Sequence, residues 1–142
     1  MSLTETHAFF SRYRDAFNAL DGDGVADLWH AGGSGIADSQ GGCGRLTWWP
    51  HDVPMRANHH ALCDVYRQAG YGRADFEIDH FVPLGADHAF ARVQWTITRA
   101  DGSLLQRFGT GYQLQRTAAG PRVLLCTAYQ EDLQEMTRHA AQ

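Results

Sequence analysis

The sequence predicts an α+β fold in which amphipathic helices of the first half cover an antiparallel sheet formed by the second half. Residues 92–98 alternate strictly between apolar odd-numbered positions and polar even-numbered ones, which is typical of a strand with one buried face. Asp101-Gly102 then supplies a hairpin turn, because both central residues of the favoured turn need positive φ. Upstream, apolar residues recur at helical spacing, which indicates the helices that bury the sheet.

Length and composition favour one globular domain over residues 1–142. The apolar fraction of 44% and the charged fraction of 20% are ordinary for such a domain. A net charge of −4, with arginine as the only strong base and no basic cluster, argues against nucleic-acid binding. No apolar run approaches the roughly 20 residues that span a bilayer, and the N-terminus lacks a signal-peptide pattern. We therefore expect a cytoplasmic protein with neither a nucleic-acid nor a membrane partner.

The cysteines and histidines predict no metal site. The three cysteines, Cys43, Cys63 and Cys126, have no metal-type spacing and no catalytic Cys–His motif, which favours free thiols. None of the eight histidines forms an i, i+4 pair with a nearby acid, the spacing that a zinc helix needs. His59 and His60 diverge by about 100° on a helix, so the two rings cannot easily share an ion. We expect neither a metal nor another cofactor.

Three helices are expected before the strands. The first follows a capping box of Ser2 and Glu5. Its apolar stripe comprises Phe9, Tyr13, Ala16, Phe17 and Leu20. The second is predicted at residues 25–30, with Trp29 facing inward, and the third at residues 53–69, with Asp52 as its N-cap. The stripe of the third helix turns His59 toward the interior.

The segment 31–44 holds six glycines. A phosphate-binding glycine loop is one interpretation, but no strand precedes it and no Gly-Lys-Ser/Thr ending follows. The other is a flexible loop with one short strand at residues 36–40. If Ile36 points into the interior, strand alternation turns Asp38 the same way.

Four strands are expected after the third helix, at residues 76–82, 92–98, 104–116 and 123–126. Alternation places His80 on the inner face of the first, and Thr110 and Tyr112 on the inner face of the third. Residues 130–139 are predicted to form a polar tail or a short final helix.

The order of residues also resembles the nuclear transport factor 2-like superfamily, and within it the SnoaL-like and ketosteroid-isomerase-like branch. The resemblance covers nearly the whole chain and rests on Arg12-Tyr13-x-x-Ala16-x-Asn18-x-x-Asp21-x-x-Gly24, Leu28-Trp29, Ile36-Ala37-Asp38 and Leu62-Cys63-x-Val65-Tyr66. It implies a cone-shaped, cystatin-like fold in which the sheet wraps round the first helix and leaves a pocket at its open end. The superfamily hosts unrelated functions on one fold.

The isomerase branch implies roles for particular positions. There, a carboxylate on the first short strand is the general base, while a tyrosine on the first helix and a protonated aspartic acid on a later strand bind the oxyanion. Position by position, the base falls on Asp38, the tyrosine on Tyr13 and the third group near Thr110. Threonine is a departure, because its hydroxyl is a weaker donor than a buried carboxylic acid.

Residues and resemblance together predict Asp38 and Tyr13 as catalytic. The predicted ligand-binding residues are His59, His80, Thr110, Tyr112, Trp29 and Trp95. Each has a structural alternative: Tyr13 as a core tyrosine, Asp38 as a turn or capping residue, and the others as packing or rim residues.

Three functions follow for such a pocket. The first is a cofactor-free isomerase, cyclase or dehydratase that uses acid–base chemistry on a small apolar carbonyl compound. The others are a non-catalytic binder of a small hydrophobic molecule and a dimeric scaffold. We also expect a homodimer through the outer sheet face, where the mid-sheet residues Gln94, Thr96, Thr98, Gln113 and Gln115 are uncharged.

Overall fold

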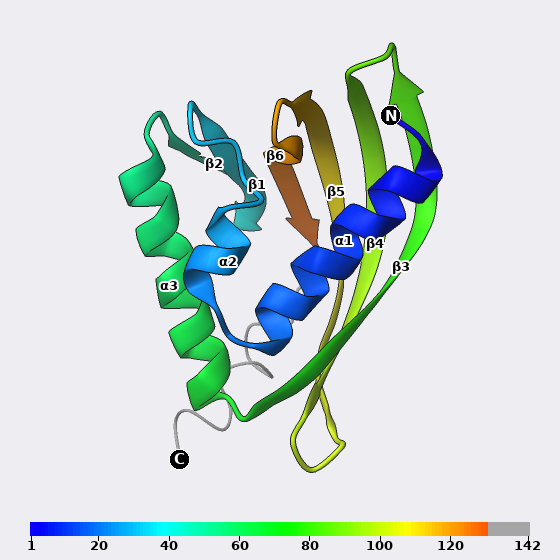
Figure 1. The fold of residues 1–142 in the computed structure, drawn as a ribbon. Coiled ribbons are helices and arrows are strands. Elements are labelled where there is room, and N and C mark those ends of the chain that lie inside the picture. The colour runs from blue at the N-terminus through cyan, green and yellow to red at the C-terminus, as the bar shows by residue number, and fades with distance from the viewer. Residues whose placement is uncertain (131–142) are drawn as a thin grey trace.

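The computed structural model describes residues 1–130, so most of the predicted tail at residues 130–139 lies outside the described residues. The elements in chain order are α1 (Leu3–Asn18), α2 (Gly22–Ala26), β1 (Ser34–Gln40), β2 (Cys43–Trp49), α3 (Asp52–Gln68), β3 (Tyr71–Leu84), β4 (His88–Arg99), β5 (Leu104–Thr117) and β6 (Gly120–Tyr129). The predicted α+β class is confirmed (Figure 1).

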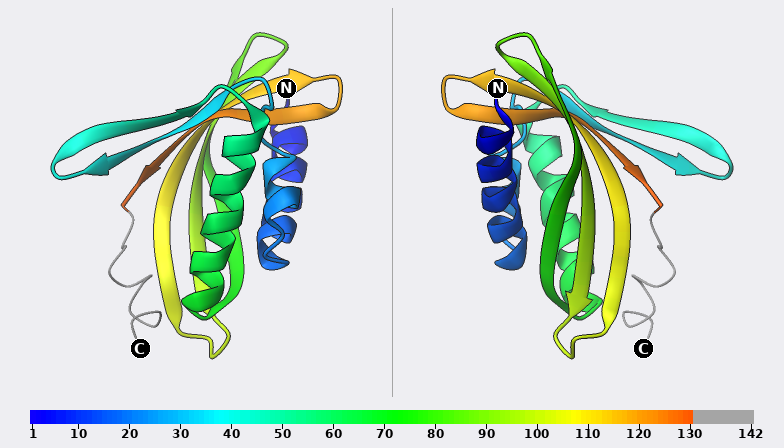
Figure 2. Two further views of the ribbon diagram at one scale, coloured as in Figure 1. Left: turned by 90° about the vertical axis from the view of Figure 1, so that its left-hand side faces the viewer. Right: turned by 90° about the vertical axis from the view of Figure 1, so that its right-hand side faces the viewer.

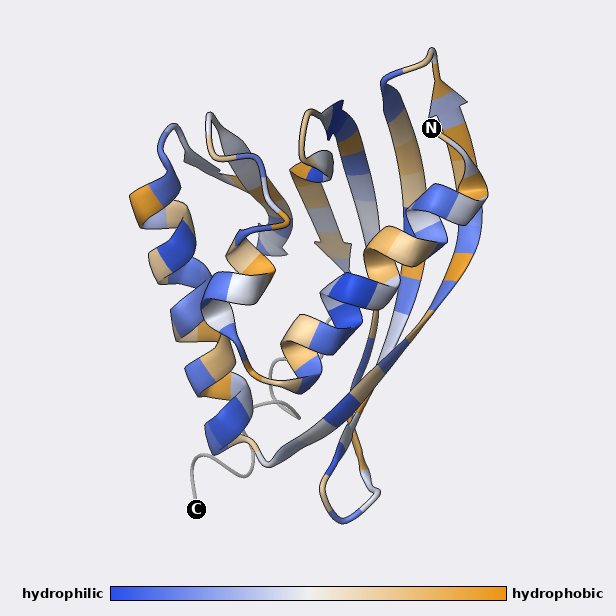
Figure 3. Ribbon diagram, viewed as in Figure 1, coloured by the Kyte–Doolittle hydropathy of each residue, from blue (hydrophilic) through white to orange (hydrophobic). Residues whose placement is uncertain are grey.

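The strands form one sheet in the order β2-β1-β6-β5-β4-β3. Neighbouring strands are antiparallel except β1 and β6, which are parallel. The sheet curves strongly, and the three helices lie on its concave side, while the β1–β2 hairpin projects away from them (Figure 2). Hydrophobic and hydrophilic residues alternate along the strands, so one face of the sheet packs against the helices (Figure 3). Among the described helices, none is both long and apolar enough to cross a bilayer.

The α1 helix is fixed at both ends. At its start the expected capping box is present, with the Ser2 side chain accepting from the Glu5 backbone N–H at 3.1 Å. Near its end, the Asn18 side-chain oxygen accepts from the Tyr71 hydroxyl at 2.7 Å and from the Ala74 N–H at 2.8 Å. These bonds tie the end of α1 to the start of β3. They thereby fix the position of the buried α1 residues, Tyr13 among them, relative to the sheet.

The second helix is shorter than predicted and begins earlier. Its N-cap is Asp21, whose carboxylate accepts from the Gly24 N–H at 3.0 Å, and it ends at Ala26. It stops there because the chain pairs with β6 instead: Val123 donates to the Leu28 carbonyl and receives a bond from the His30 N–H. Trp29 is thereby anchored between helix and sheet.

Residues 34–49 form a hairpin, which the prediction of one short strand in a flexible loop missed. Gly41 and Gly42 lie at the turn with φ values of 62° and 80°, the left-handed region that glycine occupies readily. The α3 helix that follows begins at Asp52, and its N-cap is His51 rather than Asp52. The Asp52 carboxylate instead binds Arg56 one turn later, at 2.7 Å.

The prediction that His80 faces inward is wrong. The register between β3 and β4 shifts between Ile78 and His80, so strand alternation reverses at this bulge. His80 is consequently exposed, and its neighbour Phe81 packs against the core in its place.

Candidate functional site

A partly open cavity of about 350 Å³ lies on the concave side of the sheet, within the size range of small-molecule sites. Its wall is mainly aromatic and aliphatic, with side chains from α1, α3 and most of the strands. All the predicted site residues except His80 line it: Tyr13, Trp29, Asp38, His59, Trp95, Thr110 and Tyr112. The structure therefore brings together groups that lie about a hundred residues apart in the sequence.

Asp38 lies in the β1 wall of this cavity and is held by a residue of the adjacent strand. Arg45, its direct partner in the β1–β2 register, donates from Nε to Oδ1 at 2.9 Å and from Nη2 to Oδ2 at 2.7 Å. The Asp38 side chain is 17% exposed and that of Arg45 49%. This bidentate pair fixes the plane of the carboxylate. Each oxygen keeps a further lone pair, because a carboxylate has about four acceptor sites.

Two tyrosines and two tryptophans form a polar cluster in the otherwise apolar wall. The Trp29 indole donates to the Tyr13 hydroxyl at 3.1 Å, and the Trp95 indole donates to the Tyr112 hydroxyl, also at 3.1 Å. Burial raises the pKa of both phenols well above the usual value, so both remain protonated near neutral pH. Each hydroxyl accepts an indole N–H through one lone pair, so its own proton stays free for a neighbouring hydroxyl or for a ligand.

Thr110 lines the cavity but lacks a proton to offer. Its hydroxyl donates to the Val93 carbonyl at 3.2 Å and accepts from the Trp95 indole at 3.1 Å. The Thr110 hydroxyl therefore donates within the protein at the position where the resemblance placed an oxyanion donor, and the tyrosine hydroxyls are the nearest donors to it along the wall.

His59 is the most deeply buried polar group of the wall, with 1% of its surface exposed. Its ring lies 4.7 Å from that of Trp29 and 6.4 Å from that of Trp49, measured between centroids. Burial, with smaller contributions from the charges of Arg56 and His60, lowers its pKa to about 4. The imidazole is consequently neutral at pH 7, with one nitrogen a donor and the other an acceptor.

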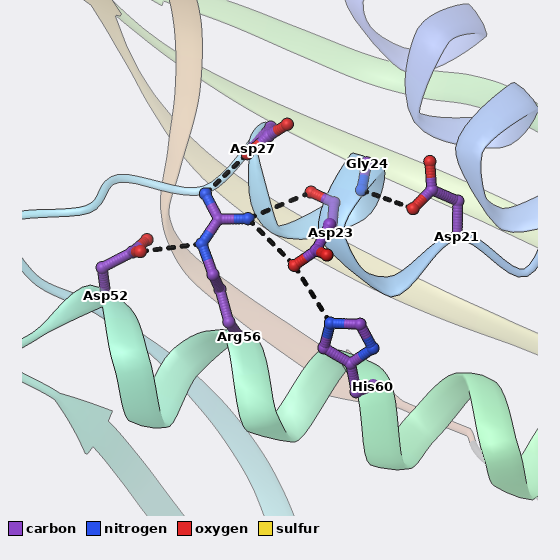
Figure 4. A network of polar contacts seen from close by, with 7 residues as sticks. All are labelled: Asp21, Asp23, Gly24, Asp27, Asp52, Arg56 and His60. Carbon is purple, nitrogen blue, oxygen red and sulfur yellow. Dashed lines mark hydrogen bonds and ion pairs between the residues drawn. The ribbon is translucent and has the colours of Figure 1, made fainter.

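A charged cluster behind this wall holds α3 against α2 (Figure 4). The Arg56 guanidinium binds Asp52 at 2.7 Å, Asp27 at 2.5 Å and Asp23 at 3.3 Å. His60 contacts the same Asp23 carboxylate at 3.0 Å, and this hydrogen bond is the main cause of the lowered pKa of Asp23. The cluster positions His59, which lies between Arg56 and His60 in the sequence, against the cavity. Within residues 1–130, no three side chains of His, Cys, Asp or Glu are grouped as metal ligands would be.

Some site residues escaped the sequence analysis. Arg45 was missed because the β1–β2 hairpin was not predicted; the Gly41-Gly42 pair was the available signal, since a turn there sets Arg45 opposite Asp38. Asn58 and Phe108 also line the cavity, and no sequence pattern distinguished them from surface or core residues.

A family model described as "NTF2-like protein (DUF6841)" matches residues 4–131, which is most of the chain. The chain belongs to this NTF2-like family. The predicted membership of the nuclear transport factor 2-like superfamily is thus confirmed. No curated protein matches the chain at a significant level.

Solved structures of NTF2-like proteins have the same fold. A cystatin-like domain of unknown function from Nostoc punctiforme superposes with a TM-score of 0.70 at 15% identity, covering 97% of this chain and 84% of that one. A ketosteroid isomerase-like protein from Erwinia carotovora atroseptica gives 0.63 at 19% identity, with 89% and 93% covered. A provisionally named dehydratase of the NTF2-like family from Streptomyces avermitilis gives 0.62 at 14%, with 89% and 93% covered. At these identities the likeness establishes the cystatin-like NTF2 fold alone.

Proposed function

We propose that the cavity binds a small, largely apolar carbonyl compound and that Asp38 moves a proton on it, as in a cofactor-independent isomerase or lyase. The observation that carries the proposal is that Asp38 and Tyr13, predicted separately from strand alternation and helix spacing, line one cavity. A neutral proton donor and a carboxylate in one largely apolar cavity are the pair that proton transfer next to a carbonyl requires.

In the proposed reaction, an Asp38 oxygen takes the proton from the carbon next to the carbonyl. The negative charge that develops on the carbonyl oxygen accepts a hydrogen bond from the Tyr13–Tyr112 pair, whose protons are not consumed by the indoles. The proton then passes from Asp38 to another carbon, which gives an isomer; alternatively a leaving group departs from the β-carbon with its bonding electrons and takes up the proton from Asp38, which gives an alkene. Arg45 keeps the carboxylate in one orientation throughout.

Exchange of the α-protons of 1-tetralone in deuterated water, followed by NMR, tests the proton transfer without knowledge of the natural substrate. We expect the wild type to accelerate exchange and Asp38→Asn to lower that rate by about 10²–10⁴-fold, the usual contribution of a general base. Stability should change by less than about 1 kcal/mol, because the ion pair that is lost is half exposed on the Arg45 side. Val53→Ala, an exposed change on α3, serves as the control and should exchange at the wild-type rate.

The second candidate function is a binder without turnover. Two observations favour it: Asp38 is held in a bidentate ion pair by Arg45, and the Thr110 hydroxyl already donates its proton to the Val93 carbonyl. If 1-tetralone binds to the wild type and to Asp38→Asn equally while neither accelerates exchange, the catalytic proposal is contradicted and the binder is supported. Native mass spectrometry of the purified protein would then identify a ligand that is retained from the host cell.

A further inference from the structure

His59 is the one residue of the cavity wall, in the part of the chain that the structure describes, whose polar side-chain atoms are all buried without a hydrogen-bond partner. Both Nδ1 and Nε2 are in this state. The neighbouring polar groups differ: Asp38 has Arg45, Tyr13 has Trp29, and Thr110 has Val93 and Trp95. The polar groups of Asp38, Tyr13 and Thr110 therefore have partners within the protein, whereas those of His59 have none.

Leaving a buried polar atom without a partner costs about 1–3 kcal/mol, and native structures contain few such atoms. Here the unpartnered ring belongs to the cavity wall, and a small shift of the ring that brings one nitrogen to the cavity surface would let a bound molecule supply the missing bond. An apolar side chain could have occupied the His59 position, since the same face of α3 presents the apolar residues Leu62 and Val65 to the cavity. A neutral imidazole between Trp29 and Trp49 offers an acceptor nitrogen to a hydroxyl or N–H group.

We propose that His59 is a specificity-determining residue that accepts a hydrogen bond from a hydroxyl group of the ligand. The ligand class is then a flat, hydroxylated cyclic or aromatic molecule, because the rings of Trp29, Trp95 and Phe108 line the same cavity. That the ligand also carries a carbonyl group rests on the proposed function. That it carries a hydroxyl group bound by His59 does not depend on that function.

The expected preference is large enough to measure. A site that is built to hydrogen-bond a hydroxyl discriminates against an analogue without it, because its own polar atom stays unpaired in the wrong complex. From the cost of one unpaired group we expect 6-hydroxy-1-tetralone to bind at least about 10-fold more tightly than 6-methyl-1-tetralone, which has nearly the same shape. The carbonyl-free probe 2-naphthol isolates the hydroxyl contribution.

Isothermal titration calorimetry with the three probes tests the inference. We expect the hydroxyl preference in the wild type, its loss in His59→Leu and its partial recovery in His59→Gln, which restores a polar partner. His51→Leu, a change at an exposed histidine whose side chain forms no capping hydrogen bond, is the matched control and should keep the preference. Asp38→Asn should keep it as well, since Asp38 lies on β1 and is paired with Arg45 rather than with His59.

The outcomes separate this inference from the proposed function. Equal affinity of the wild type for the hydroxy and methyl tetralones overturns the role of His59, and this comparison needs no variant to fold. If His59→Leu still binds the hydroxy tetralone more tightly than the methyl tetralone, the proposed role of His59 is overturned as well. If 2-naphthol binds through His59 but no tetralone exchanges protons, the catalytic proposal fails while the hydroxyl site stands. If none of the three probes binds, both are overturned.

Discussion

Burial of the His59 imidazole couples the stability of the fold to pH. Its pKa falls from an ordinary 6.5 in the unfolded chain to about 4 in the folded protein. Between these values the unfolded state binds the proton and the folded state does not, so stability decreases as the pH falls through the window and levels off below about 4. This behaviour belongs to a histidine that is buried neutral, and is the opposite of that of a histidine with an acidic partner.

We therefore predict that His59 contributes a loss of about 2 kcal/mol in unfolding free energy between pH 7 and pH 5. Urea denaturation at the two pH values measures it as a difference between variants, because other groups titrate equally in both. His59→Leu should lose less stability than the wild type by this amount, and His51→Gln, at an exposed histidine without a capping hydrogen bond, should follow the wild type. If His59→Leu lost as much unfolding free energy between pH 7 and pH 5 as the wild type, the His59 ring would not be desolvated in the folded protein.

At single residues, strand parity and helix spacing were sufficient where the backbone is regular. Asp38 and Tyr13 line the cavity as alternation and the α1 stripe predict. The same reasoning failed for His80, because one bulge in β3 reverses the facing of every later residue and leaves no mark in the sequence pattern. It also could not assign the Thr110 proton, which depends on Val93 and Trp95 of the adjacent strand.

At the scale of elements, β3 begins with a backbone contact that only glycine allows. A Cβ atom at Gly72 would lie 2.5 Å from the carbonyl carbon of Arg99 and 2.6 Å from its oxygen. These are backbone atoms of the paired strand, so they cannot rotate away as a side chain would. The register shift between Tyr71 and Arg73 permits the close approach.

Gly72→Ala should accordingly destabilise the protein by about 1–3 kcal/mol, since it forces β3 and β4 apart. Gly44→Ala in β2 is the matched control: nothing lies within 4 Å of the added methyl group, and we expect a change within about 0.5 kcal/mol. Chemical denaturation measures both variants. Equal stabilities for the two would show that the β3–β4 pair relaxes freely at this point.

The long strands and the first and third helices were predictable because their patterns repeat over several turns or residue pairs. The β1–β2 hairpin was not, because six glycines in residues 31–44 suggested a loop, and only the Gly41-Gly42 turn indicated pairing. The second helix was misplaced for a different reason. Its apolar spacing continues to Trp29, but pairing of residues 28–30 with Val123 ends it early, and that is a long-range interaction.

For the whole molecule, the convex face of the sheet is the surface where we predict a homodimer. Thr110 and Tyr112 of β5 face the cavity. Strand alternation therefore turns Gly109 and Gly111 of the same strand outward. The rings of Tyr129 and Phe90 lie against these two glycines and are half-buried. The face is therefore more aromatic than its glutamines and threonines alone indicate, and aromatic side chains are enriched in protein interfaces.

A charge in the middle of this face should separate the two copies. In a two-fold interface a residue near the axis meets its own copy, so a new carboxylate at that position is placed twice in the same desolvated region. We expect the wild type to be a dimer at micromolar concentration and Gln113→Glu, between Phe90 and Leu125 of the flanking strands, to sediment as a monomer. Val53→Glu, on an α3 residue that is 77% exposed, should leave the dimer intact. A monomeric wild type in sedimentation equilibrium, or a dimer unaffected by Gln113→Glu, would assign this face to solvent.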